Sequence, residues 1–154
     1  MMSTELVTAI QEDQKLIVVL MDNDGYKSIG SLSRSLGQAG FGTRYAYSQD
    51  DRVTSDTDGN DVVRIPVDLA ANARSLGATV IECSGYAEFV AGIARARANP
   101  TTTVVYVRND RYHGVPGYDS WWDVPPAEVS TSADVQAKRT EWAQKRADER
   151  DYLG

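Results

Sequence analysis

Six apolar residues in a row, Leu16 to Met21, constrain the fold of this chain more than any other stretch. The run is too short for a core helix and is β-branched in its middle, which predicts a strand covered on both faces. Strands of that kind are typical of open, mostly parallel α/β sheets. The run ends at the polar turn 22–25 and an amphipathic helical pattern begins at once, which is where α/β proteins place ligands.

The rest of the chain repeats the same alternation of strand and helix. Capping and periodicity predict a helix over 69–76 begun by Asp68, a strand over 78–83, a helix begun by Ser84 with Phe89, Val90 and Ile93 inward, and a strand over 103–107. Connections of this length imply right-handed parallel crossovers. The predicted fold class is therefore α/β, an open and mostly parallel sheet with helices on both faces, followed by a C-terminal helical extension.

Composition shifts near residue 118 and predicts two parts. Residues 1–117 form one α/β domain in which 48–60 reads as an exposed loop. Residues 118–154 hold an aromatic and proline segment and then a charged helix over 132–153, whose narrow apolar stripe includes Val135 and Trp142. We expect this second part to pack on the domain or on a neighbouring subunit.

Charge and composition exclude several classes of partner. The chain has 154 residues, a net charge of −6 and a pI near 4.7, which argues against nucleic acid or an anionic membrane as the main partner. No apolar run approaches the roughly 18 residues of a membrane span. A single cysteine, Cys83, excludes an internal disulfide framework. We expect a cytoplasmic protein.

The polar turn is the place to look for chemistry. Asp22, Asn23 and Asp24 supply side-chain oxygens and Gly25 supplies a carbonyl, next to the start of a helix. Magnesium prefers oxygen ligands and commonly bridges to phosphates, so the turn could seat both. The alternative is that these residues only form the turn and cap the helix, with Gly25 supplying a positive φ.

The stretch IVVLMDNDGYKSI followed by SLSRSLGQAGFGTRY resembles the second half of the magnesium and diphosphate motif of thiamine diphosphate-dependent enzymes. Within that superfamily, this stretch, the helix start at Val67 to Ala70 and the segments Trp121 to Val124 and Glu128 to Ser130 are similar to the trihydroxycyclohexanedione hydrolases of inositol breakdown. The similarity extends over nearly the whole chain.

The resemblance implies two cofactors, thiamine diphosphate and Mg²⁺. It makes Asn23 a side-chain metal ligand and Gly25 a carbonyl metal ligand, and it places Asp24, Tyr26 and Lys27 beside the diphosphate. The implied reaction is hydrolytic cleavage of a carbon–carbon bond in a polyol-derived cyclic dione. No catalytic residue of this segment is assigned.

The resemblance also implies partners. Sites in this family lie between subunits, which implies a homodimer or homotetramer. The Gly-Asp-Gly half of the motif would fall just before Met1. We therefore expect the chain to be a C-terminal part that lacks N-terminal domains and is inactive in isolation.

Two other interpretations stay open. An apolar strand followed by Asp-x-Asp-Gly also resembles the first motif of haloacid dehalogenase-type phosphatases, with Asp22 as nucleophile and Asp24 as general acid. The other possibility is a non-catalytic half-domain that dimerises through the open edges of its three-stranded sheet.

Four other chemically versatile residues or pairs receive no site role. His113 lies in a turn-rich stretch, Cys83 ends a buried strand, and the pair Trp121 and Trp122 precedes two prolines. Arg44 could reach a phosphate or a carboxylate and ranks below Asn23.

Overall fold

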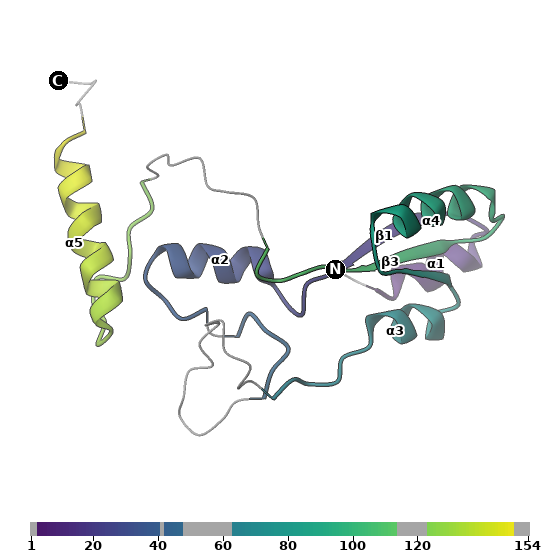
Figure 1. The fold of residues 1–154 in the computed structure, drawn as a ribbon, viewed down its shortest axis with the longest axis horizontal. Helices are drawn as coiled ribbons and strands as arrows, with labels where there is room; N and C mark the ends of the chain where they lie inside the picture. The colour runs from purple at the N-terminus through teal and green to yellow at the C-terminus, as the bar shows by residue number, and fades with distance from the viewer. Residues whose placement is uncertain (1–2, 41, 48–62, 114–122, 150–154) are drawn as a thin grey trace. The chain divides into compact units, whose positions relative to one another are not determined.

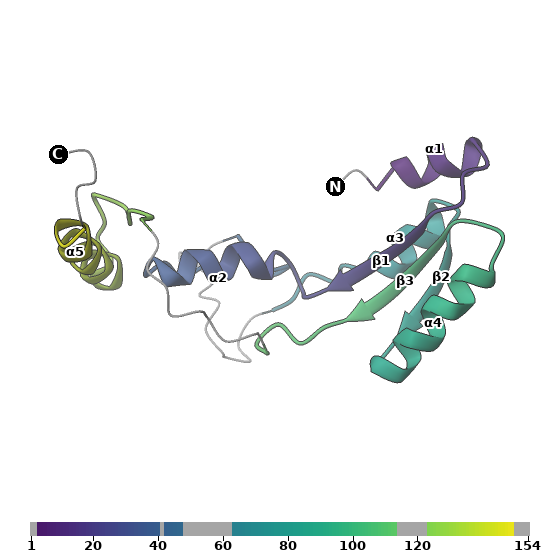
Figure 2. The ribbon, with the colours of Figure 1, turned by 90° about the horizontal axis from the view of Figure 1, so that it is seen from above.

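The computed structural model describes residues 3–40, 42–47, 63–113 and 123–149. The elements in chain order, labelled in Figures 1 and 2, are α1 (Glu5–Gln11), β1 (Ile17–Asp22), α2 (Lys27–Ser35), α3 (Leu69–Ser75), β2 (Thr79–Cys83), α4 (Tyr86–Ala98), β3 (Thr103–Arg108) and α5 (Ala133–Ala147). The chain divides into two compact units. The first contains Met1–Asn23 and Pro66–Arg111, and the second contains Asp24–Ile65 and Tyr112–Gly154.

A three-stranded parallel sheet forms the centre of the first unit. Its order is β1-β3-β2, and Val105 of β3 lies between Val19 of β1 and Ile81 of β2. Helix α4 covers one face of the sheet and helix α3 lies on the other (Figure 2). The predicted α/β fold class is confirmed.

Two apolar cores lie on opposite faces of this sheet. On one face α4 packs Phe89 and Ile93 against a cluster that includes Val105. The other face holds a cluster around Val104, to which α1 contributes Leu6. Alternate residues of a strand point to opposite faces, so β3 serves both cores.

Close packing of α4 on the sheet depends on its small residues. A Cβ at Gly92 would lie 2.9 Å from the Cys83 Sγ and 3.4 Å from a Val105 methyl carbon. The neighbouring turn of the helix contributes Ala96, which is fully buried. Gly92 therefore sets how near α4 can approach.

The helix starts were predicted with mixed success. Asp68 caps α3 as expected, because its Oδ1 accepts a 2.7 Å hydrogen bond from the Ala71 amide. The prediction that Ser84 caps α4 is wrong. Gly85 is the N-cap, and the Glu88 carboxylate accepts a bond from the Ser84 amide instead. Val90, expected inward, is half exposed.

The prediction that the first strand is covered on both faces is also wrong. Strand β1 lies at the edge of the sheet, where Val18 and Leu20 pack inward. Ile17, Val19 and Met21 are 39%, 42% and 57% exposed on the opposite face. The physical reason is that α4 rests on β2 and β3, and their neighbour β1 lies outside its cover.

The second unit contains α2 and the charged helix α5. Gly37 follows α2 with φ +79°, and a Cβ there would lie 2.6 Å from the Asp134 carbonyl oxygen. This close approach lets α2 end against the start of α5, where Val135 is buried. Helix α5 ends at Ala147, earlier than the predicted residue 153. The 48–60 loop and the tryptophan pair lie outside the described residues, as does the predicted boundary at 117–118.

Candidate functional site

Asp22 ends β1 at the carboxyl edge of the sheet and is held by β3 and the residues that follow it. Its Oδ2 accepts a 2.7 Å hydrogen bond from the Tyr106 hydroxyl, and its carbonyl accepts one from the Asn109 amide at 2.8 Å. Burial, together with the hydrogen bond to the Asp22 carboxylate, raises the pKa of Tyr106 to about 12. Tyr106 therefore stays protonated and keeps donating at neutral pH.

Asn23 follows directly and its backbone is fixed by an arginine. The Arg111 guanidinium donates a 3.1 Å hydrogen bond to the Asn23 carbonyl, and Arg111 is buried. Arg111 was not among the predicted site residues. The position of Arg111 just beyond β3 could have indicated that it lies near the turn, because the carboxyl ends of parallel strands meet at one edge of a sheet.

In the second unit, the turn at Gly25 is bonded on both sides to the segment 43–45. The Tyr26 amide donates to the Thr43 carbonyl at 2.8 Å, and the Tyr45 amide donates to the Asp24 carbonyl at 3.2 Å. Gly25 lies opposite Arg44 in this short antiparallel bridge. In such a pair the central residue's own N–H and C=O point away from the partner strand. The Gly25 carbonyl therefore points away from segment 43–45.

Only glycine fits at the centre of this turn. Gly25 has φ +136°, and a Cβ would lie 2.4 Å from the Thr43 carbonyl oxygen. The preceding residue, Asp24, also has a positive φ of 63°. Two successive residues with positive φ give the turn a backbone conformation that most L residues can adopt only with strain. The positive φ that the turn-only alternative assigned to Gly25 is confirmed, whereas α2 has Tyr26 as its N-cap and no side-chain cap.

The Asp24 carboxylate lies between two guanidinium groups. Its Oδ2 is 3.4 Å from Arg64 and 3.8 Å from Arg44. The Arg44 side chain is only 5% exposed, whereas the Arg64 side chain is 49% exposed. Arg44 also lies over the Tyr112 ring, with 5.8 Å from its central carbon to the ring centroid. Two cations near one carboxylate offset its negative charge, which matters wherever an anion must bind next to it.

Tyr26 and Lys27 begin α2 beside the same turn. The Tyr26 ring is exposed and meets the Tyr45 ring edge-on, with 6.0 Å between centroids. The Lys27 ammonium donates a 2.6 Å hydrogen bond to the His113 carbonyl. His113 thus contributes a main-chain oxygen here.

The structure therefore describes the predicted site as two halves. Asp22 and Asn23 belong to the first unit, and Asp24, Gly25, Tyr26 and Lys27 belong to the second. Among the described residues, no group of three or more His, Cys, Asp or Glu side chains could hold a metal ion. The predicted metal ligands are the side-chain amide oxygen of Asn23 and the main-chain carbonyl oxygen of Gly25. Neither is a side chain of those four residue types.

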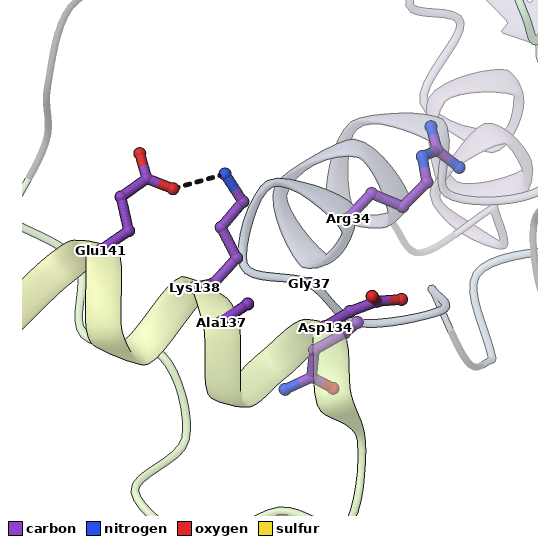
Figure 3. A pocket seen from close by; sticks show the side chains of 7 residues that line it. Arg34, Gly37, Asp134, Ala137, Lys138 and Glu141 are labelled. Carbon is purple, nitrogen blue, oxygen red and sulfur yellow. Dashed lines mark hydrogen bonds and ion pairs between the residues drawn. The ribbon is translucent and has the colours of Figure 1, made fainter.

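A separate hollow of about 540 Å³ lies between the end of α2 and the start of α5 (Figure 3). Its lining residues have mixed charge: Arg34, Gly37, Gln38, Asp134, Ala137, Lys138 and Glu141. Hydrogen bonds from Lys138 and Lys145 lower the pKa of Glu141 to about 2. None of the predicted site residues lines this hollow.

The fold and the turn together define a class of protein. A parallel α/β unit whose strand ends in an oxygen-rich turn is typical of domains that bind ligands beyond the carboxyl ends of their strands. Residues 1–107 match the family of thiamine pyrophosphate enzymes, in its C-terminal TPP-binding domain, and the chain belongs to this family. Thiamine pyrophosphate is another name for thiamine diphosphate. The match favours that interpretation over the phosphatase alternative.

Curated relatives carry more specific names. The chain is 32% identical over 137 residues to 3D-(3,5/4)-trihydroxycyclohexane-1,2-dione hydrolase 1 of Bacillus cereus, and 31% identical to hydrolase 2 of the same strain. It is 32% identical to the hydrolase of Bacillus thuringiensis. Each alignment covers 89% of this chain and 20% of the relative, so the chain spans about a fifth of their length. No solved structure matches significantly.

None of the described helices combines the length and the apolar composition that a membrane-spanning helix needs.

Proposed function

We propose that this chain supplies the magnesium- and diphosphate-binding part of a thiamine diphosphate-dependent enzyme. In this proposal the Asn23 side chain and the Gly25 carbonyl bind Mg²⁺, and Asp24, Tyr26 and Lys27 lie beside the diphosphate. The observation that carries the proposal is the Gly25 carbonyl, which flanking hydrogen bonds turn away from segment 43–45 at a position where no Cβ fits.

The chemistry of the donors fits these groups. Magnesium favours neutral and anionic oxygen ligands and is commonly bound by a few protein oxygens together with substrate phosphates. Lys27 supplies a compact positive charge of the kind that binds phosphate. Arg44 and Arg64 offset the charge of Asp24, which would otherwise repel a diphosphate.

The activity of the whole enzyme follows as a second proposal. The relatives are named as hydrolases of a cyclic dione, so we propose the same reaction class for the enzyme to which this chain contributes. When bound, thiamine diphosphate supplies the nucleophilic carbon and the electron sink that carbon–carbon cleavage requires. The residues of this chain bind and orient the diphosphate end. We propose a cytoplasmic homodimer or homotetramer, and no turnover by this chain alone, since it spans only a fifth of its relatives.

The contacts of α5 support treating residues 118–154 as one extension. The Trp142 indole donates a 2.9 Å hydrogen bond to the Asp123 carboxylate, and Arg139 donates one to the Pro126 carbonyl at 3.2 Å. Arg139 also lies over the Trp142 ring at 4.4 Å. Asp123 and Pro126 are thereby held along the helix. We propose that this extension packs on the cofactor-binding domain or on a neighbouring subunit.

Calorimetry on the 154-residue chain tests the metal and diphosphate proposal. We expect weak binding of thiamine diphosphate that requires Mg²⁺ and disappears when the metal is chelated. Asn23→Ala should weaken the Mg²⁺-dependent binding at least about tenfold, equivalent to about 1.4 kcal/mol. Asn72→Ala, at an exposed asparagine of α3, is the matched control and should bind like the wild type. Binding that ignores the metal, or that Asn23→Ala leaves unchanged, would contradict the proposal.

A further inference from the structure

The turn at Gly25 belongs to a ribbon of three short segments in the second unit. Segment 43–47 pairs with the turn on one side and with segment 63–65 on the other, through two antiparallel bridges. In the second of these pairs, the Ile65 amide donates a 2.9 Å hydrogen bond to the Tyr45 carbonyl. The segment that precedes α3 is therefore linked to the turn through one shared neighbour.

Arg44 and Arg64 lie on one face of this ribbon. Ala46 is opposite Arg64 across the bridge, and it is two residues along the segment from Arg44. Directly opposed residues of an antiparallel pair share a face, and so do alternate residues of one strand. The distances agree, because the Asp24 Oδ2 lies 3.8 Å from Arg44 and 3.4 Å from Arg64. Both cations therefore reach the same carboxylate.

The two arginines contact Asp24 in different ways. Arg44 makes the contact through Nη2, and its buried side chain lies over the Tyr112 ring. Arg64 makes the contact through Nε, and its side chain is half exposed. A guanidinium is a planar fork that carries five N–H donors. In Arg64 the carboxylate takes the Nε corner of that fork, so the edge formed by the two terminal Nη groups faces a different direction.

We propose that Arg64 is a diphosphate-binding residue, and that its terminal Nη groups donate to oxygens of the diphosphate. The inference rests on the proposed function and adds to it a residue that was not among the predicted site residues. The planar fork of arginine suits phosphate, because two parallel N–H groups can bind two of its oxygens. Asp24 is then a positioning residue, since it holds the Nε corner while the other edge meets the anion.

This arrangement gives a reason for a carboxylate beside a diphosphate. A lone carboxylate there would repel the anion. Asp24 instead lies between two guanidinium groups and orients the one whose side chain is half exposed. Lys27, at the start of α2, supplies a further positive charge beside the same turn, and its ammonium is held by the His113 carbonyl. The arginine that offsets the charge of Asp24 most closely in the interior is Arg44, which leaves Arg64 to bind the ligand.

Substitution of Arg64 in two backgrounds separates direct binding from charge compensation. Binding of thiamine diphosphate at saturating Mg²⁺ is measured by a chemical-shift titration of the 154-residue chain, which suits weak affinities. Arg64→Met should weaken binding about tenfold to a hundredfold, as for the loss of a hydrogen bond from a charged group. A similar loss should appear in an Asp24→Asn background, where no carboxylate charge remains to be offset.

Asp24→Asn is a suitable background for this comparison. Asparagine tolerates the positive φ of Asp24, and its amide oxygen can still accept a hydrogen bond from the Nε of Arg64. Any effect of Asp24→Asn itself cancels, because both chains compared carry it. If Arg64→Met weakens binding only in the chain that retains Asp24, Arg64 acts solely through that carboxylate and the proposal is overturned.

The Arg64 guanidinium also gives a direct spectroscopic readout. Its Nε–H signal in a proton–nitrogen spectrum is identified by its loss in Arg64→Met. We expect this signal to shift with the same midpoint as the Gly25 amide when thiamine diphosphate is added with Mg²⁺. Inorganic pyrophosphate with Mg²⁺, which lacks the thiamine rings, should shift both signals too. A Gly25 signal that moves while the Arg64 signal stays in place would overturn the proposal.

Arg74 on α3 provides the matched control. Its side chain is 49% exposed, as is that of Arg64, and it forms an ion pair with Glu82. Arg74→Met should bind thiamine diphosphate like the wild type, and the Arg74 Nε–H signal should not shift. Arg64→Lys keeps the charge without the fork and should bind with intermediate affinity. Equal losses for Arg64→Met and Arg74→Met would overturn the proposal, because they would show that any removed arginine charge has the same effect.

The outcome can be told apart from a failure of the proposed function. Arg64→Met should stay folded, since a half-exposed ion pair contributes little to stability, and Arg64→Lys retains the charge if it does not. If Asn23→Ala weakens the Mg²⁺-dependent binding and neither Arg64 variant does, the proposed function stands and this inference is overturned. A wild-type chain that binds no thiamine diphosphate at saturating Mg²⁺ would overturn both.

Discussion

The two halves of the candidate site are held in place by different means. Asp22 and Asn23, in the first unit, are held by the backbone ladder to β3 and by two side chains from β3 and just beyond it, Tyr106 and Arg111. The Gly25 turn, in the second unit, is fixed by backbone hydrogen bonds to segment 43–45. The comparison teaches that the first half depends on side-chain chemistry, whereas the second depends on the absence of a side chain.

The largest effect should come from filling the space at Gly25. Gly25→Ala places a Cβ 2.4 Å from the Thr43 carbonyl oxygen, at a φ that L residues avoid. We expect a loss of at least about 3 kcal/mol in the stability of the second unit, because strain and overlap add. All three tryptophans belong to that unit, so tryptophan fluorescence in a urea titration measures it.

A glycine with open surroundings is the control for that experiment. Gly85 begins α4 with an extended φ of −164°, and an added Cβ meets nothing within 4 Å. Gly85 lies in the first unit, so the measurement for this variant is amide hydrogen exchange in β2 and α4, and Gly85→Ala should change the stability of that unit by less than about 0.5 kcal/mol. If both alanine variants behave alike, the argument for a steric requirement at Gly25 fails.

The next effect concerns the arginine behind Asn23. Arg111→Ala removes a buried donor from the Asn23 carbonyl, and we expect a cost of about 2 to 3 kcal/mol in the first unit, as for a hydrogen bond from a charged group. Amide hydrogen exchange in β1 and β3 reports on this unit. Arg108→Ala, at an exposed arginine that ends β3, should cost far less. Equal costs for the two arginines would show that the contact with Asn23 contributes nothing.

A smaller effect is expected at the Asp22 carboxylate. Tyr106→Phe removes only the hydroxyl that donates to Asp22 and should cost about 1 kcal/mol. Asp22→Asn should also weaken this hydrogen bond. We expect the wild type to have no phosphatase activity, so this substitution should have none to remove. Measurable hydrolysis of an aryl phosphate by the wild type, abolished in Asp22→Asn, would restore the phosphatase interpretation.

The raised pKa of Tyr106 gives the same contact a pH signature. The pKa rises from 10.0 to about 12 in the folded chain, so the folded state retains this proton longer than the unfolded state. The stabilisation is therefore complete below pH 10 and is lost as the pH rises through about 12. Ultraviolet titration should show one tyrosine ionising later than the others, and that late step should vanish in Tyr106→Phe.

The smallest effect should come from the exposed partner of Asp24. Arg64→Met removes a half-exposed ion pair, which should cost less than about 1 kcal/mol. Arg44→Met removes a buried guanidinium from the same carboxylate and should cost more. Urea titrations of both variants by tryptophan fluorescence compare the two arginines. A larger loss of stability for Arg64→Met than for Arg44→Met would contradict the expectation that the buried guanidinium contributes more.

Local signals in the sequence predicted local structure well. Asp68 caps α3 because a capping side chain bonds an amide only three residues away. The positive φ at Gly25 and the parallel strands followed from turn chemistry and alternation. Ser84 failed as a cap because the helix begins one residue later, with Gly85 as its N-cap, and the Ser84 amide donates to the Glu88 carboxylate.

Long-range features were out of reach of the same reasoning. The exposed face of β1 depends on which helix covers which strand. An apolar run in the sequence does not indicate which helix will cover it. Tyr106 and Arg111 reach the turn from 84 and 88 residues away, through a register that only the folded sheet defines. The predicted site residues Asn23, Asp24, Gly25, Tyr26 and Lys27 remain predictions about ligand contact.

The central claim is that a divalent cation binds at the turn that contains Asn23 and Gly25, and paramagnetic NMR tests it most directly. Mn²⁺ would replace Mg²⁺ in the presence of thiamine diphosphate, and amide signals near the bound ion would broaden. We expect the signals of Gly25 and Tyr26 to broaden while that of Gly92 in α4 stays sharp, and Asn23→Ala to remove the effect. Broadening confined to α5 near Asp134 and Glu141, with Gly25 unaffected, would contradict the account.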